Sequence, residues 1–212
     1  MIISHSKQIC FWKIPRTGST TVELLLRLLA GLDFSQDVIA KGYFFPAGYN
    51  FGMMPDSPSG VPGERRTHIT PQEAIDNNVM TLAQYNSYQN FVMIRDPVEK
   101  FISAYQFGMP GRTFDPAGII TDTIIPNPQS HFGLWKKQVE WLTLGNITAL
   151  PFSDYQNSLT TVVTAFGGTM PTDIPNVSRR HLRFEEIVRQ IATPAHRASI
   201  RAHYSEDEAL NF

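Results

Sequence analysis

The sequence of 212 residues has one cysteine, almost no net charge and no long apolar run. An intrachain disulfide is excluded because Cys10 stands alone, and its place in the apolar stretch 9–12 favours a buried structural thiol over a nucleophile. No apolar run reaches the length of about 18 residues that spans a bilayer, and residues 1–8 lack the apolar core of a signal peptide. These absences predict a cytoplasmic protein without a membrane span.

The formal net charge is -1. An extended nucleic-acid interface normally brings a basic excess, so a nucleic-acid partner is not expected, although a local basic pocket for one phosphorylated ligand is compatible with this charge. No histidine or carboxylate cluster has the spacing of metal ligands, and we expect no metal. The length is that of one ordinary α/β domain, which predicts a single domain over residues 1–212. The oligomeric state is not indicated.

Short apolar segments alternate with amphipathic ones. The pattern predicts strands at 8–14, 90–94 and 147–152, and helices at 19–32, 96–107, 134–144 and 154–166. Such alternation is typical of an α/β fold with a parallel sheet covered by helices on both faces. Two segments rich in glycine and proline, 42–63 and 108–130, are predicted as long loops, either packed on the surface or forming a lid or acceptor wall.

Residues 14–21 read I-P-R-T-G-S-T-T and lie between the first predicted strand and the first helix. A helix start presents amide groups and the positive end of the helix dipole, which bind phosphate or sulfate. Arg16 adds a fixed positive charge and Gly18 permits close backbone approach. Hydroxyl groups come from Thr17, Ser19, Thr20 and Thr21. The simpler alternative is an N-cap after a proline turn, and the motif is not a Walker A loop, which needs a longer glycine loop and a lysine.

A second candidate anion site lies in residues 91–105, F-V-M-I-R-D-P-V-E-K-F-I-S-A-Y. Asp96 is placed as an N-cap, Pro97 at the first helical position and Glu99 to complete a capping box. Arg95 leaves the predicted strand beside this helix start, where charge and dipole together attract an anion. Alternatively, Arg95 makes only a structural ion pair with Asp96 or Glu99.

Together the two segments resemble the motifs of PAPS-dependent sulfotransferases, particularly the carbohydrate or heparan-sulfate branch, where PAPS is 3'-phosphoadenosine-5'-phosphosulfate. The first is similar to the 5'-phosphosulfate loop I-P-K-T-G-[GS]-T-[ST], with Arg16 in place of the usual lysine. The second is similar to the 3'-phosphate motif R-D-P-x-x-R-x-x-S-x-Y, with Lys100 where arginine is frequent. Looser similarities at 138–142 and 204–210 extend the resemblance over the whole chain.

The resemblance implies a P-loop-NTPase-like three-layer fold, with a central parallel sheet flanked by helices. It implies that Arg95 and Ser103 hold the 3'-phosphate, while residues 16–21 hold the phosphosulfate. A basic segment at 176–181 would close over the 3'-phosphate through Arg180, unless it is simply a solvated turn. Arg16 keeps the lysine's charge but is a poor proton donor, so its catalytic role would be electrostatic.

The family takes its catalytic base, a histidine or sometimes a glutamate, from the segment between the two motifs. His68 is the only histidine between Arg16 and Arg95, and histidine titrates in the useful range. Glu64 is the substitute base. A surface or N-cap histidine is the plain alternative for His68.

The sequence therefore predicts transfer of a sulfuryl group from PAPS to an acceptor hydroxyl, with PAP as the product. The predicted acceptor is a small molecule or a saccharide. Arg65, Arg66 and Arg112 near the predicted loops favour an anionic acceptor such as a saccharide, and the loop aromatics would suit stacking on sugar rings. Two alternatives stay open. One is a P-loop-like kinase that uses ATP and Mg²⁺, and the other is a non-catalytic module that binds a nucleotide or a saccharide.

Overall fold

The computed structural model describes residues 1–29, 68–109, 113–127, 133–170, 188–210 and 212. Within them, four strands form one sheet in the order β1, β2, β3, β4. The strands are β1 (Ile2–Ser4), β2 (Ile9–Trp12), β3 (Gln89–Ile94) and β4 (Thr148–Pro151). β2, β3 and β4 run parallel, and β1 pairs antiparallel with β2. The α/β class is confirmed, whereas the likeness to P-loop NTPases stays a prediction.

The antiparallel edge strand β1 was not predicted, and the expectation of a parallel sheet is wrong there. Ile3 lies opposite Cys10, and all three residues of β1 are buried. Residues 5–8 form the turn that joins β1 to β2, with Gln8 at φ 54°. A turn this short can only join antiparallel strands.

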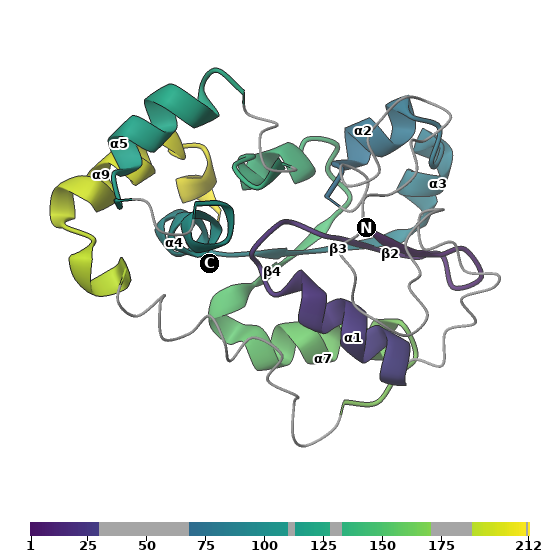
Figure 1. The fold of residues 1–212 in the computed structure, drawn as a ribbon. Helices are drawn as coiled ribbons and strands as arrows, with labels where there is room; N and C mark the ends of the chain where they lie inside the picture. The colour runs from purple at the N-terminus through teal and green to yellow at the C-terminus, as the bar shows by residue number, and fades with distance from the viewer. Residues whose placement is uncertain (30–67, 110–112, 128–132, 171–187, 211) are drawn as a thin grey trace.

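Helices cover both faces of the sheet (Figure 1). α1 (Ser19–Leu29) and α7 (Tyr155–Ala165) lie on one face, while α2 (Pro71–Asp76) and α3 (Leu82–Ser87) lie on the other. The strands divide their side chains between the two faces with the expected period of two. Phe11 and Met93 pack into the cluster with α1 and α7, whereas Cys10 and Trp12 pack into the opposite cluster. Burial raises the pKa of the Cys10 thiol, in agreement with a structural role.

α4 (Pro97–Gly108) follows β3 directly and begins as predicted. The Asp96 carboxylate accepts a hydrogen bond from the Glu99 amide at 3.0 Å, with Pro97 at the first helical position. The carboxylate of Glu99 does not complete a capping box. It lies 2.7 Å from Nε of Arg189 instead.

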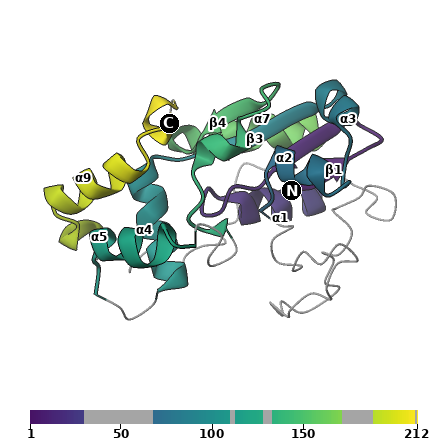
Figure 2. The ribbon, with the colours of Figure 1, turned by 90° about the horizontal axis from the view of Figure 1, so that it is seen from above.

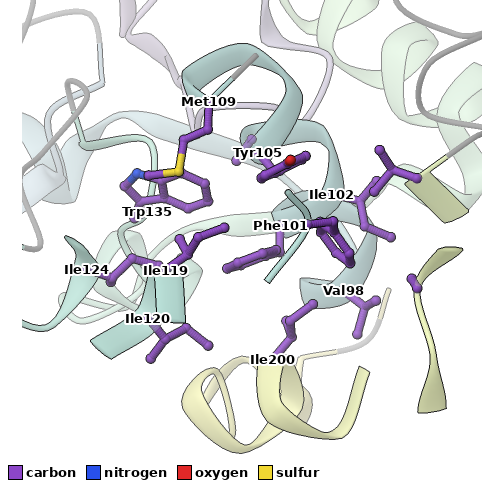
Figure 3. Close-up of a cluster of buried hydrophobic side chains, with 14 of the residues drawn as sticks. Val98, Phe101, Ile102, Tyr105, Met109, Ile119, Ile120, Ile124, Trp135 and Ile200 are labelled. Atoms are coloured by element: carbon purple, nitrogen blue, oxygen red, sulfur yellow. The ribbon is translucent and has the colours of Figure 1, made fainter. Parts of the chain in front are cut away.

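Beside the sheet, α4 packs with α5 (Pro116–Ile119) and α9 (Pro194–His203) in a separate apolar cluster (Figure 2). Phe101 lies at its centre, with its ring centroid 5.2 Å from that of Trp135 (Figure 3). The apolar side chains on one face of α4 pack into this cluster. The position of α4 is therefore set by apolar burial.

Two element predictions are wrong. The supposed loop 108–130 contains α5 and a π-helical turn, Ile120–Ile124, which bury Ile119, Ile120 and Ile124. The supposed helix 134–144 is mostly irregular, with a short 3-10 helix at Gln138–Trp141. Trp135 packs into the cluster around α4, and Trp141 packs into the cluster on the α2 and α3 face of the sheet. The Lys100 ammonium also donates hydrogen bonds to the backbone carbonyls of residues 134 and 136, at 3.3 and 2.9 Å.

Several predicted features fall outside the described residues. They are the loop 42–63, Glu64, Arg65, Arg66, Arg112 and Arg180. Among the helices that the structure does describe, none combines the length and apolarity needed to cross a bilayer.

Candidate functional site

The two predicted anion motifs meet at the carboxyl edge of the sheet. β2 and β3 are parallel neighbours, so the residues that follow them emerge side by side, where ligands bind in open α/β sheets. Nη1 of Arg95 donates a hydrogen bond to the carbonyl oxygen of Arg16 at 3.1 Å. Residues distant in the sequence are thereby joined in one site.

The loop after β2 turns through two residues with positive φ, Arg16 at 65° and Gly18 at 77°. The carbonyl of Gly18 accepts the amides of Thr21 and Val22 at 3.0 and 3.3 Å, which starts α1. A Cβ atom on Gly18 would lie 2.6 Å from Cε2 of Tyr155. Glycine is therefore required by both the backbone conformation and the contact.

The hydroxyl side chains of this loop differ in their surroundings. Thr17, Ser19 and Thr21 are buried, whereas Thr20 is exposed. The Thr17 hydroxyl donates to the carbonyl of Ile14 at 3.0 Å and so braces the loop. Backbone amides at the start of a helix, with hydroxyl side chains beside them, are groups of the kind that bind a phosphate.

The Arg16 side chain extends from the loop to α4. Its Nε donates to the Ser103 hydroxyl at 3.0 Å, and its guanidinium carbon lies 5.2 Å from the centroid of the Phe107 ring. The Arg16 side chain therefore spans the gap between its own loop and α4, the helix that was predicted to hold a second phosphate. Arg16, Arg95 and Ser103 form one cluster.

Arg95 is buried, and its guanidinium carbon lies 4.6 Å above the ring of Phe152. The ion pair with Glu99 that was the alternative reading is present, but it is long, at 3.7 Å between Nη2 and Oε2. Arg189 approaches the same carboxylate oxygen more closely. One carboxylate thus faces two guanidinium groups, with Arg16 nearby as a third, so these four side chains carry a net charge of about +2. An anion would be attracted to them.

His68 lies at the end of β2. Its Nδ1 is 2.8 Å from the carbonyl oxygen of Lys13, and because a carbonyl only accepts, Nδ1 carries the hydrogen and Nε2 has the free lone pair. Burial, followed by the positive charge of Lys13, lowers the pKa of His68 to about 3. Nζ of Lys13 is itself paired with Glu23 at 2.5 Å. His68 is therefore a neutral imidazole at pH 7.

Lys100, which replaces the arginine of the second motif, points away from this site. Its ammonium is buried between the carbonyls of Leu134 and Lys136, and burial lowers its pKa to about 8. The lysine therefore supports the fold rather than the anion cluster.

Phe152 and Tyr155 were missed as parts of the site. Phe152 lies under Arg95, and the Tyr155 hydroxyl is 3.4 Å from the carbonyl oxygen of Gly18. Both follow β4, whose carboxyl end lies at the same edge as those of β2 and β3. Their position after a parallel strand was the signal that could have identified them. In the described part of the chain, no group of three His, Cys, Asp or Glu side chains is placed to hold a metal ion.

A family model described as the sulfotransferase family matches residues 1–127. The matched part contains both anion motifs and His68, and it is more than half of the 212 residues. No curated protein and no solved structure matches the chain.

Proposed function

Because the chain belongs to the sulfotransferase family, we propose that it transfers a sulfuryl group from PAPS to an acceptor hydroxyl and releases PAP. The observation that carries this proposal is the contact of Arg16 with both Arg95 and Ser103, at 3.1 and 3.0 Å. PAPS has an anionic group on each side of its ribose. A donor of this kind needs two anion sites on one edge of the sheet, and the two motifs meet there.

The residues present suit such a donor. The amides and hydroxyls of residues 17–21 would hold the 5'-phosphate, and Arg95 with Ser103 would hold the 3'-phosphate. Arg16 lies between them and would contact either group, since its planar guanidinium offers donors in two directions. The rings of Phe107 and Phe152, which already lie against the two guanidinium groups, would limit the positions these can take.

In the reaction, bound PAPS would supply the sulfur electrophile and a phosphate leaving group. Nε2 of His68 accepts the proton of the acceptor hydroxyl as its oxygen forms the new bond to sulfur. The loop amides and Arg16 stabilise the charge that develops on the 5'-phosphate as its bond to sulfur breaks. Arg16 acts by charge and does not transfer a proton.

A histidine with a pKa of about 3 is a weak base in the free protein. A nearby negative charge favours the protonated form of an imidazole. The donor's phosphates and sulfate would therefore raise the pKa of His68 upon binding. The base would gain strength only in the complex where it is needed.

We further propose a small-molecule acceptor of saccharide type. Phe107 supports this proposal, because its ring is 49% exposed and lies beside Arg16. A half-exposed ring next to a guanidinium suits the apolar face of a sugar that also carries anionic groups.

The test is transfer of radiolabelled sulfate from PAPS to a panel of saccharide and phenolic acceptors. His68→Ala is expected to lower kcat by about a hundredfold or more, with a dissociation constant for PAP that changes less than about threefold. His203→Ala is the matched control, since His203 lies on α9 and should leave kcat unchanged. If no acceptor in the panel yields PAP, the proposed activity is refuted. If His68→Ala keeps full activity, the assignment of His68 as the base is refuted.

A further inference from the structure

The side-chain amide of Gln138 pairs with both backbone groups of Arg95. The Arg95 amide donates to Oε1 of Gln138 at 2.8 Å, and Nε2 of Gln138 donates to the Arg95 carbonyl at 2.6 Å. β3 pairs with β4 only as far as Ile94, opposite Pro151. Gln138 therefore continues the hydrogen bonding of β3 for one residue beyond its end, at the residue that bears the guanidinium.

The segment that carries Gln138 is hydrogen-bonded to residues near the end of the described chain. The Asp207 carboxylate accepts the amides of Gln138 and Val139, each at 3.0 Å. The Tyr204 hydroxyl donates to the carbonyl of Trp135 at 2.8 Å. Gln138 and Asp207 are both fully buried, so water does not compete for these bonds.

This pairing fixes the orientation of the Arg95 peptide, and a long side chain amplifies any rotation at its backbone. The far end of Arg95 must reach the carbonyl of Arg16 on one side and lie over Phe152 on the other. Two hydrogen bonds to its backbone reduce the number of orientations from which it can do so.

We propose that Gln138 is a positioning residue that sets selectivity for the 3'-phosphate by orienting Arg95. The proposal rests on the proposed function and adds a residue to it. Gln138 bonds to the backbone of Arg95 and would act on the nucleotide through Arg95. Asp207 holds the backbone of Gln138 itself, so this residue near the end of the described chain contributes to nucleotide selectivity.

The experiment compares calorimetric binding of PAP with that of adenosine 5'-monophosphate, which lacks the 3'-phosphate. In Gln138→Met, the preference for PAP should fall about tenfold, while affinity for the monophosphate changes less than about twofold. Tyr204→Phe is the matched control. It loosens the same segment at Trp135 but breaks no bond to Arg95 or Gln138, so it should lower stability and keep the preference.

The outcomes separate the two proposals. A wild-type protein that does not prefer PAP would refute the PAPS-dependent function. A wild-type preference that Gln138→Met retains would refute the role of Gln138 alone. If Gln138→Met does not fold, the same binding measurement is made on Asp207→Asn. This variant weakens the hydrogen bonds that hold the backbone of Gln138, while the Gln138 side-chain amide is retained. A preference reduced about threefold supports the proposal, and an unchanged preference overturns it.

Discussion

Gly18 has both a positive φ and close neighbours. Its φ of 77° disfavours any side chain, and an added Cβ would meet Tyr155 at 2.6 Å. We expect Gly18→Ala to lower the free energy of unfolding by about 2–4 kcal/mol, through backbone strain plus overlap. It should also weaken PAP binding, because the loop must shift. Urea denaturation and calorimetry measure the two effects.

Gly145 provides the control for this prediction. It has a similar φ of 66°, but an added Cβ would meet no atom within 4 Å. Gly145→Ala should therefore cost only the strain, about 1 kcal/mol, with normal PAP binding. Equal losses in the two variants would show that the contact with Tyr155 is unimportant.

Gln106 is buried on α4, and neither atom of its amide has a hydrogen-bond partner within the described ranges. An unsatisfied buried amide costs about 1–3 kcal/mol. Gln106→Leu should therefore stabilise the protein, with a melting temperature higher by about 2–4 °C. Gln138→Leu is the contrasting variant. It removes a fully bonded amide and should lower the melting temperature. A loss of stability in Gln106→Leu would contradict the account of that residue.

The titration of His68 gives a prediction with a definite sign. Its pKa in the folded protein, about 3, is below the usual value of 6.5. Protonation therefore favours the unfolded state, so the contribution of His68 to stability is complete above about pH 6.5 and is lost as the pH falls toward 3. NMR should show a neutral ring at pH 5 in the free protein and a higher pKa with PAP bound. A free-protein pKa near 6.5 would show that His68 is not desolvated in the folded protein.

The site residues that the sequence could reveal are those carried by local motifs. Arg16, Arg95 and Ser103 stand at recognisable positions after strands or within the following helix, and the structure brings them together. Gln138 and Phe152 were not identified as site residues, because their roles depend on contacts between segments far apart in the chain. Periodicity carries no information about such contacts.

α4 belongs to the second motif and contacts the first motif through Ser103 and Arg16. The contribution of its N-cap can be tested. Asp96→Ala removes the acceptor of the Glu99 amide and should cost about 1 kcal/mol. Because α4 carries Ser103, PAP binding should weaken by a few fold. Thr81→Ala removes the equivalent cap of the remote helix α3 and should cost a similar amount without affecting PAP binding. A loss of PAP affinity in both variants would show a general effect of stability.

Helices and strands with strong local signals were predicted well, and β3, α4 and α7 lie close to their expected bounds. The predictions failed where tertiary contacts override local pattern. Residues 134–144 have helical spacing of apolar side chains, but Lys100 and Asp207 take the backbone groups that a helix would use. β1 is short and stabilised by pairing with β2, which no local pattern in residues 2–4 indicates.

In the whole molecule, three buried clusters adjoin the edge of the sheet at which we propose the functional site. One cluster lies on each face of the sheet, and the third fixes α4 and α9 beside it. The proposed anion site lies where the segments that follow β2, β3 and β4 meet α4. The family membership follows from residues 1–127, and the later segments add Phe152, Gln138 and Asp207, which support Arg95 from the other side.

The central claim is that a single bisphosphorylated nucleotide bridges the loop after β2 and the start of α4. A crystal structure of the protein with PAP tests it most directly. We expect the 5'-phosphate within about 3 Å of the amides of residues 17–21, and the 3'-phosphate within about 3 Å of Arg95 and Ser103. PAP bound elsewhere, or bound with only one phosphate in this site, would contradict the claim.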